Sequence, residues 1–150
     1  MFYTRIPCPI DIEHNSQTLN KASRYFTLIG WVVGVFSFLV FHTSSILFDQ
    51  SISVVLSLVA GILITGAFHE DGLTDVFDGF GGGWTKQKIL DIMKDSRIGA
   101  FGTISIVLLI LFKYSSLNSI LFDNDKWILN LLVFISYHSL SRLTSVNLIF

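Results

Sequence analysis

Charged residues are scarce in this chain. Asp, Glu, Lys and Arg make up 14% of its 150 residues, whereas soluble domains contain about 25%. Hydrophobic residues make up 51% of the chain. An ordinary soluble domain does not have so few charges and so much apolar surface, so this class is disfavoured.

Cysteine and proline are also rare, and the net charge is small. Cys8 is the single cysteine, which excludes an intrachain disulfide, a zinc knuckle and a Cys-x-x-Cys redox site. The 2 prolines and 14 phenylalanines exclude a collagen-like or disordered chain. The net charge of -1 provides no basic patch, so nucleic acid is not an expected partner.

The apolar residues gather in four blocks, residues 25–41, 52–68, 98–112 and 127–150. A transmembrane helix needs roughly 17 to 25 mostly apolar residues, which three blocks supply and the third reaches if extended. We therefore expect an all-α fold, a polytopic membrane helix bundle with about four transmembrane helices. The alternative, a buried helical core in a soluble protein, is disfavoured because little else in the chain could cover four uncharged blocks.

The basic residues are distributed unevenly between the blocks. Most of them precede the first block or follow the second: Arg5, Lys21, Arg24, Lys86, Lys88, Lys94 and Arg97. None separates the first two blocks, and only Lys113 and Lys126 separate the last two. The positive-inside rule then places the N-terminus and residues 69–97 in the cytoplasm. We expect a multi-pass protein of the cytoplasmic (inner) membrane.

Gly30 and Gly34 form a Gly-x-x-x-Gly spacing within the first block. This spacing lets two helix backbones approach closely, because neither residue has a side chain. We predict a packing role for both glycines.

The second block leads directly into an acidic, glycine-rich segment. If its helix continues, Asp71, Asp75 and Asp78 occupy positions i, i+4 and i+7 on one face, while Glu70 points elsewhere. Like charges this close repel, most strongly at a membrane edge, so the arrangement indicates a bound cation. Ligands that are all oxygen favour Mg²⁺, Mn²⁺ or Ca²⁺. A solvated acidic loop is the alternative.

Three or four carboxylates could hold one ion or a pair, and such sites stabilise the oxygens of a phosphoryl transfer. Gly72 and Gly79 lack side chains, so a bulky substrate could approach the backbone beside the acidic face. Residues 79–83 could instead be a flexible connector. They are not a Walker A loop, because no Gly-Lys-Ser/Thr follows.

A short helix is predicted after the glycines, capped by Thr85 and extending to about Ser96. Ile89, Ile92 and Met93 form its apolar stripe, which we interpret as an anchor on the membrane surface.

Two arginines are candidate phosphate ligands. Arg97 follows Asp95 just before the third block, and it could bind a phosphate with two hydrogen bonds or simply extend to the membrane interface. Arg142 lies four residues after His138 inside the fourth block. It could bind substrate or form a salt bridge with one of the aspartates.

Three segments resemble the cobalamin-5'-phosphate synthase (adenosylcobinamide-GDP ribazoletransferase) family. They read Thr-Arg-Ile-Pro-x-Pro at residues 4–9, Gly-Ala-Phe-His-x-Asp-Gly-Leu-x-Asp-x-x-Asp-Gly at residues 66–79, and Ile-Met-Lys-Asp-Ser-Arg-Ile-Gly at residues 92–99. Their order and the apolar blocks between them fit the family as well.

The resemblance implies a Mg²⁺-dependent membrane enzyme. It would join adenosylcobinamide-GDP to α-ribazole or its 5'-phosphate and release GMP, completing the nucleotide loop of cobalamin (vitamin B12). Position by position, it implies metal ligands and nearby substrate-binding residues: Asp71, Asp75 and Asp78 for the metal, Asp95, Arg97 and Arg5 for the substrate. Glu70 departs from the family pattern, because relatives commonly have an apolar residue there. We keep it as a candidate fourth metal ligand, with a peripheral position as the alternative.

Family members continue with further membrane helices. We therefore expect residues 1–150 to be a single membrane-embedded domain that forms the N-terminal part of a longer enzyme. In the mechanism that we expect, Asp75 or Asp78 is the general base, and Arg97 or Arg142 binds phosphate. The expected partners are the two substrates and membrane lipid, with a homo-oligomer as a further option.

Two rival functions use the same carboxylates. A CDP-alcohol type of membrane phosphotransferase is disfavoured, because its Asp-Gly-x-x-Ala-Arg start is not present. A cation transporter or channel could use the aspartates as a binding ring, but such sites usually lie near the bilayer midplane. A purely structural membrane subunit is the remaining alternative.

Overall fold

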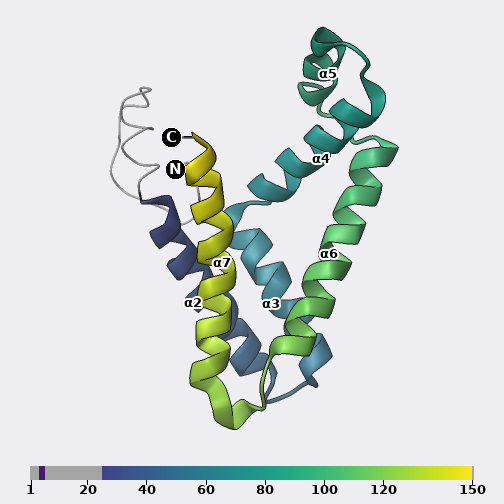
Figure 1. Ribbon diagram of the computed structural model, residues 1–150. Coiled ribbons are helices and arrows are strands. Elements are labelled where there is room, and N and C mark those ends of the chain that lie inside the picture. The colour runs from purple at the N-terminus through teal and green to yellow at the C-terminus, as the bar shows by residue number, and fades with distance from the viewer. Residues whose placement is uncertain (1–3, 6–24, 150) are drawn as a thin grey trace. The chain divides into compact units, whose positions relative to one another are not determined.

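The computed structural model describes residues 4–5 and 25–149, and within them all regular secondary structure is helical, as predicted (Figure 1). The helices, in chain order, are α2 (Phe26–Ser44), α3 (Gln50–Thr65), α4 (Phe68–Gly82), α5 (Lys86–Met93), α6 (Ala100–Ile120), the short 3₁₀ helix η1 (Asn124–Lys126) and α7 (Trp127–Ile149). They belong to two compact units. The first unit comprises Met1–Gly66 and Asn118–Phe150, and the second comprises Ala67–Leu117.

In the first unit, α7 lies alongside α2 (Figure 1). The two backbones approach closely at two glycines of α2. A Cβ atom added at Gly30 would lie 2.7 Å from the carbonyl oxygen of His138. One added at Gly34 would lie 2.8 Å from the Cα atom of Ile135. Neither position has room for a side chain, so the packing role predicted for the Gly-x-x-x-Gly spacing is confirmed.

Helix α3 ends earlier than the second apolar block predicts. The block continues to residue 68, but α3 ends at Thr65, because Gly66 adopts a left-handed conformation with φ of 71°. Such a glycine is a common helix terminator. Ala67 also has a positive φ, 59°, and α4 begins at Phe68. The second helix therefore does not continue without a break into the acidic segment, and the alternative of a solvated acidic loop is not what the structure shows. The acidic residues lie on a separate helix.

Helix α5 begins where the sequence predicts. The Thr85 hydroxyl accepts a hydrogen bond from the backbone N–H of Lys88 at 3.3 Å. The predicted cap is therefore present, and the helix ends at Met93, a little before the predicted end.

The apolar stripe of α5 packs against glycines at the end of α4 and just after it. A Cβ atom added at Gly79 would lie 2.7 Å from Cγ of Met93, and one added at Gly83 would lie 2.6 Å from Cγ1 of Ile89. Part of this stripe therefore packs on protein, although its three residues are only half-buried, and its interpretation as a membrane anchor stays a prediction. Gly79 provides space for α5 rather than for a substrate. Gly72, by contrast, has open space around it.

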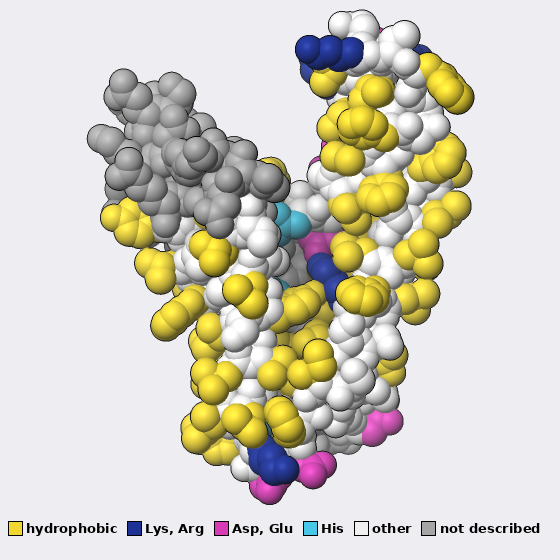
Figure 2. Space-filling view, in the orientation of Figure 1, with side chains coloured by type: hydrophobic (Ala, Val, Ile, Leu, Met, Phe, Trp, Pro, Cys, Tyr) yellow, Lys and Arg dark blue, Asp and Glu magenta, His cyan; other side chains and the backbone are white. Residues whose placement is uncertain are grey.

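By length and composition, α2 and α6 could each cross a membrane, and α3 and α4 could do so as one interrupted span. The described residues thus supply two spans, or three with the interrupted pair, and the expected four are not confirmed. On α6 the side chains of Ile104, Leu108 and Phe112 are 59%, 61% and 71% exposed. Figure 2 shows many other hydrophobic side chains exposed on the visible surface of the helices. Surfaces of this kind are typical of a membrane protein.

Several expectations concern residues outside the described part of the chain. They include Lys21 and Arg24, which support the predicted orientation, residues 6–9 of the N-terminal motif, and residue 150 at the end of the fourth block. The cytoplasmic location of residues 69–97 stays a prediction.

Candidate functional site

Helix α4 carries all four acidic residues that were predicted as metal ligands. Glu70 and Asp71 lie in its first turn, where negative charge interacts favourably with the helix dipole. Asp71, Asp75 and Asp78 follow at the spacing of one helical face, as predicted. Their surroundings differ, since Asp71 is exposed, Asp75 is half-buried and Asp78 is only 8% exposed. The three carboxylates are therefore not equivalent.

Asp78 is engaged with the start of α6. Its carboxylate accepts hydrogen bonds from the backbone N–H of Gly99 at 2.6 Å and of Gly102 at 2.8 Å. Each oxygen accepts one of them. This role of the two glycines was not predicted from the sequence, although Gly99 closes the third motif.

Glu70 points away from the aspartates, as predicted, and pairs with a lysine of α6. Oε1 of Glu70 lies 3.0 Å from Nζ of Lys113, and the two side chains are only 12% and 23% exposed. Lys113 was not recognised as its partner from the sequence, although it is the single charged residue of α6. Charges this deeply placed are costly unless they are paired.

Replacing Glu70 by Gln is expected to destabilise the full-length protein by about 1–3 kcal/mol, because the Lys113 ammonium then loses its counter-charge. Thermal unfolding in detergent measures this. Lys113→Met should recover part of the loss in the Glu70→Gln background. Asp123→Asn is the control, because Asp123 is exposed and makes no side-chain cap. Equal unfolding temperatures for Glu70→Gln and the control would show that the pair contributes nothing.

Asp71 and Asp75 remain as the acidic side chains without hydrogen-bond or ion-pair partners in the described part of α4 and its neighbours. Within the described residues, no three Asp, Glu, His or Cys side chains are grouped closely enough to bind one metal ion. Mg²⁺ commonly uses one or two protein carboxylates and takes its other ligands from water and substrate phosphates. The chemistry of this pair fits such an ion.

Asp95 and Arg97 form an ion pair between α5 and α6. Nη2 of Arg97 lies 2.6 Å from Oδ2 of Asp95, and the Arg97 backbone N–H also donates to that carboxylate, at 3.1 Å. These hydrogen bonds lower the pKa of Asp95 to about 2 and raise that of Arg97. Because the pKa of Asp95 is depressed, the pair weakens only as the pH falls toward 2, and it is charged at neutral pH. The Arg97 side chain is 87% exposed and accessible to an anion.

Arg5 and Arg142, the other predicted substrate-binding residues, belong to the first unit. The backbone N–H of Arg5 donates to the carbonyl oxygen of Ile64 at 2.8 Å, and its side chain lies against Gly66.

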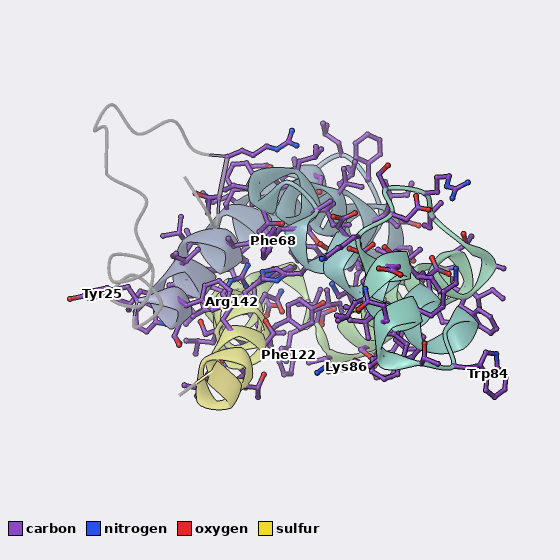
Figure 3. All side chains as sticks on the ribbon, turned by 90° about the horizontal axis from the view of Figure 1, so that it is seen from above. Tyr25, Phe68, Trp84, Lys86, Phe122 and Arg142 are labelled. Carbon is purple, nitrogen blue, oxygen red and sulfur yellow. The ribbon has the colours of Figure 1, made fainter. Side chains whose placement is uncertain are left out.

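Arg142 is 3% exposed and donates to the carbonyl oxygen of His138 at 2.8 Å. Its guanidinium lies 5.7 Å from the ring centre of Phe26, where α7 and α2 run side by side (Figure 3). The Phe26 ring stabilises the buried charge of Arg142.

An apolar groove of about 340 Å³ lies on a different face of α4. Its lining is almost entirely hydrophobic, consisting of Val76, Phe77, Phe80, Gly81 and Phe101. Such a groove does not suit a phosphate, so the acidic face is the better candidate for a metal and a diphosphate.

Comparison with known proteins identifies relatives along the whole chain. The profile of the cobalamin-5-phosphate synthase family matches residues 1–150. Curated proteins from Shewanella frigidimarina, Shewanella amazonensis and Shewanella pealeana, each named adenosylcobinamide-GDP ribazoletransferase, are 46%, 42% and 47% identical to it. No solved structure matches the chain.

The alignments with these three relatives cover 99% of this chain but 56%, 56% and 57% of the relatives. The chain thus spans a little over half the length of the curated proteins it matches. The family profile nevertheless covers every residue of the chain, including the acidic helix and the Asp95–Arg97 pair. The chain belongs to the cobalamin-5-phosphate synthase family.

Proposed function

We propose that this chain is part of an adenosylcobinamide-GDP ribazoletransferase, a Mg²⁺-dependent membrane enzyme of cobalamin synthesis. It joins adenosylcobinamide-GDP to α-ribazole or α-ribazole 5'-phosphate and releases GMP. The observation that carries the proposal is the family match over residues 1–150. The carboxylates of Asp71 and Asp75, which have no hydrogen-bond or ion-pair partners within the described residues, support it. They could hold a metal ion, and phosphoryl transfer depends mainly on positioning and charge neutralisation.

Asp71 and Asp75 are the proposed Mg²⁺ ligands. Bound there, the ion would neutralise negative charge on the diphosphate. Glu70 and Asp78 were also predicted as ligands, but their carboxylates contact Lys113 and two backbone N–H groups instead. We therefore assign the metal to the two aspartates whose oxygens are available.

In the proposed reaction, a ribose hydroxyl of the ribazole attacks the phosphorus that carries the cobinamide. The bond from this phosphorus to the bridging oxygen breaks, and GMP leaves with that oxygen and its electron pair. Asp75 accepts the hydroxyl proton. Of the two aspartates predicted as bases, it is the better candidate, because both oxygens of Asp78 already accept backbone hydrogen bonds. A carboxylate has two oxygens, so one can contact the ion while the other accepts the proton.

Arg97 is the proposed phosphate ligand of the second unit. Its guanidinium is exposed, and Asp95 holds it through charged hydrogen bonds. Such an orientation suits a guanidinium that binds two phosphate oxygens at once. Arg5 and Arg142 are proposed to bind substrate from the first unit.

The enzyme is proposed to lie in the inner membrane, in contact with lipid and with its acidic helix toward the cytoplasm. A homo-oligomer is compatible with this proposal.

The test is a transfer assay with the full-length protein in lipid vesicles. Adenosylcobinamide-GDP is supplied with α-ribazole or its 5'-phosphate, and products are identified by mass. We expect a cobalamin product and one GMP for each product formed. Cation flux across the vesicles without any GMP release would instead favour a transporter and would refute the proposal.

A further inference from the structure

Asp78 connects two motifs that are separate in the sequence. It lies on α4, and its carboxylate accepts hydrogen bonds from Gly99 and Gly102 at the start of α6. The first backbone N–H groups of a helix have no partner within the helix, and the helix dipole is positive there. A buried carboxylate provides acceptors for these N–H groups and places a negative charge at the positive end of the dipole. Asp78 therefore caps the start of α6 from another helix.

Neither of the two glycines that donate to Asp78 has room for a side chain. A Cβ atom added at Gly99 or at Gly102 would lie 2.9 Å from Cγ of Asp78. At Gly102 it would also lie 2.9 Å from the carbonyl oxygen of Thr74. The glycines therefore let the start of α6 reach the carboxylate.

We infer that Asp78 is a positioning residue and not a metal ligand: it clamps the start of α6, and the Asp95–Arg97 pair just before it, to the helix that carries Asp71 and Asp75. The part of this inference that concerns metal binding rests on the proposed function. Asp78 is only 8% exposed, and each of its carboxylate oxygens already accepts a backbone hydrogen bond. A metal ion would therefore have little access to this carboxylate and would compete with two backbone N–H groups for it.

The first experiment compares Asp78→Asn with Asp75→Asn in the full-length protein. Mn²⁺ binding followed by electron paramagnetic resonance should be unchanged in Asp78→Asn and at least about tenfold weaker in Asp75→Asn. Well below the unfolding temperature, Asp78→Asn should lower kcat by about 10- to 100-fold, because the positioned segment shifts, without changing the half-saturating Mg²⁺ concentration. Equal weakening of Mn²⁺ binding by the two variants would overturn the inference.

The second experiment is a double-mutant cycle on the unfolding temperature, with Asp78→Ala, Gly102→Ala and the double variant. Because both changes disrupt one contact, the double variant should lose less stability than the sum of the two losses. Additive losses would overturn the inference. Gly72→Ala is the matched control, since Gly72 has open space around it on the same helix as Asp78, and it should not lower stability. Should Asp78→Ala not fold, Asp78→Asn replaces it, because it keeps one acceptor oxygen.

Neither the Mn²⁺ measurement nor the cycle requires transfer activity. A wild-type protein that releases no GMP would refute the proposed function but leave the clamp intact. Additive losses in the cycle together with normal GMP release would refute the clamp alone.

Discussion

Asp75→Asn should lower kcat for GMP release by about 10³-fold while leaving the unfolding temperature of the full-length protein nearly unchanged. The substitution preserves the shape of the side chain but removes its negative charge and its ability to accept a proton. Because the Asp75 side chain makes no hydrogen bond or ion pair within the described residues, little stability depends on it. Initial rates of GMP release at saturating substrate and Mg²⁺ measure the effect.

The control for this prediction is Asp91→Asn. Asp91 is an exposed aspartate of the same unit, and its carboxylate accepts a hydrogen bond from Nε2 of Gln87 at 2.9 Å. Its substitution changes the net charge equally but should leave turnover nearly unaffected. If Asp75→Asn turns over as fast as Asp91→Asn, Asp75 is neither base nor ligand.

Gly34→Leu should prevent α2 from packing against α7. An added Cβ atom alone would already lie 2.8 Å from α7 backbone atoms, and backbone atoms cannot move aside as a flexible side chain can. We expect the free energy of unfolding to fall by about 3 kcal/mol or more, which is at or beyond the upper end of the usual cost of overpacking a core. The readouts are the unfolding temperature and the yield of monodisperse full-length protein in detergent.

Val35→Leu is the matched control for Gly34→Leu. Val35 is the next residue of the same helix, is 39% exposed and can accommodate a larger apolar side chain toward lipid. Gly34→Leu should therefore have a much lower unfolding temperature and yield than Val35→Leu. Equal stability would show that the close approach of α2 and α7 is unimportant.

Local features of the fold could be predicted from the sequence. The apolar blocks indicated the long helices, because composition and length are enough for that inference. Thr85 indicated the start of α5, and the spacing of Gly30 and Gly34 indicated close packing. The break before α4 was harder to predict. Gly66 is a typical helix terminator, but an alanine with positive φ at position 67 has no sequence signal.

Features that depend on distant contacts could not be predicted from the sequence. Asp71, Asp75 and Asp78 look alike in spacing and type. They differ because, of the three, Asp78 is the one that accepts hydrogen bonds from the start of α6, through glycines 21 and 24 residues further along the chain. Glu70 similarly meets Lys113 across 43 residues. The amphipathic pattern of α5 showed that one face is covered, but not whether lipid or glycines of α4 cover it. The periodicity of a sequence identifies the apolar face of a helix, but it does not show what packs against that face.

The central claim is that α4 carries a metal-dependent phosphoryl-transfer site formed by Asp71 and Asp75. Its most direct test is GMP release by the full-length protein, titrated with Mg²⁺ for the wild type and for Asp71→Asn. Asp71 is exposed, so its substitution should not disturb folding. We predict no GMP release in EDTA and a half-saturating Mg²⁺ concentration that is at least about tenfold higher in Asp71→Asn. Full GMP release in EDTA, or the same Mg²⁺ curve for both proteins, would contradict the claim.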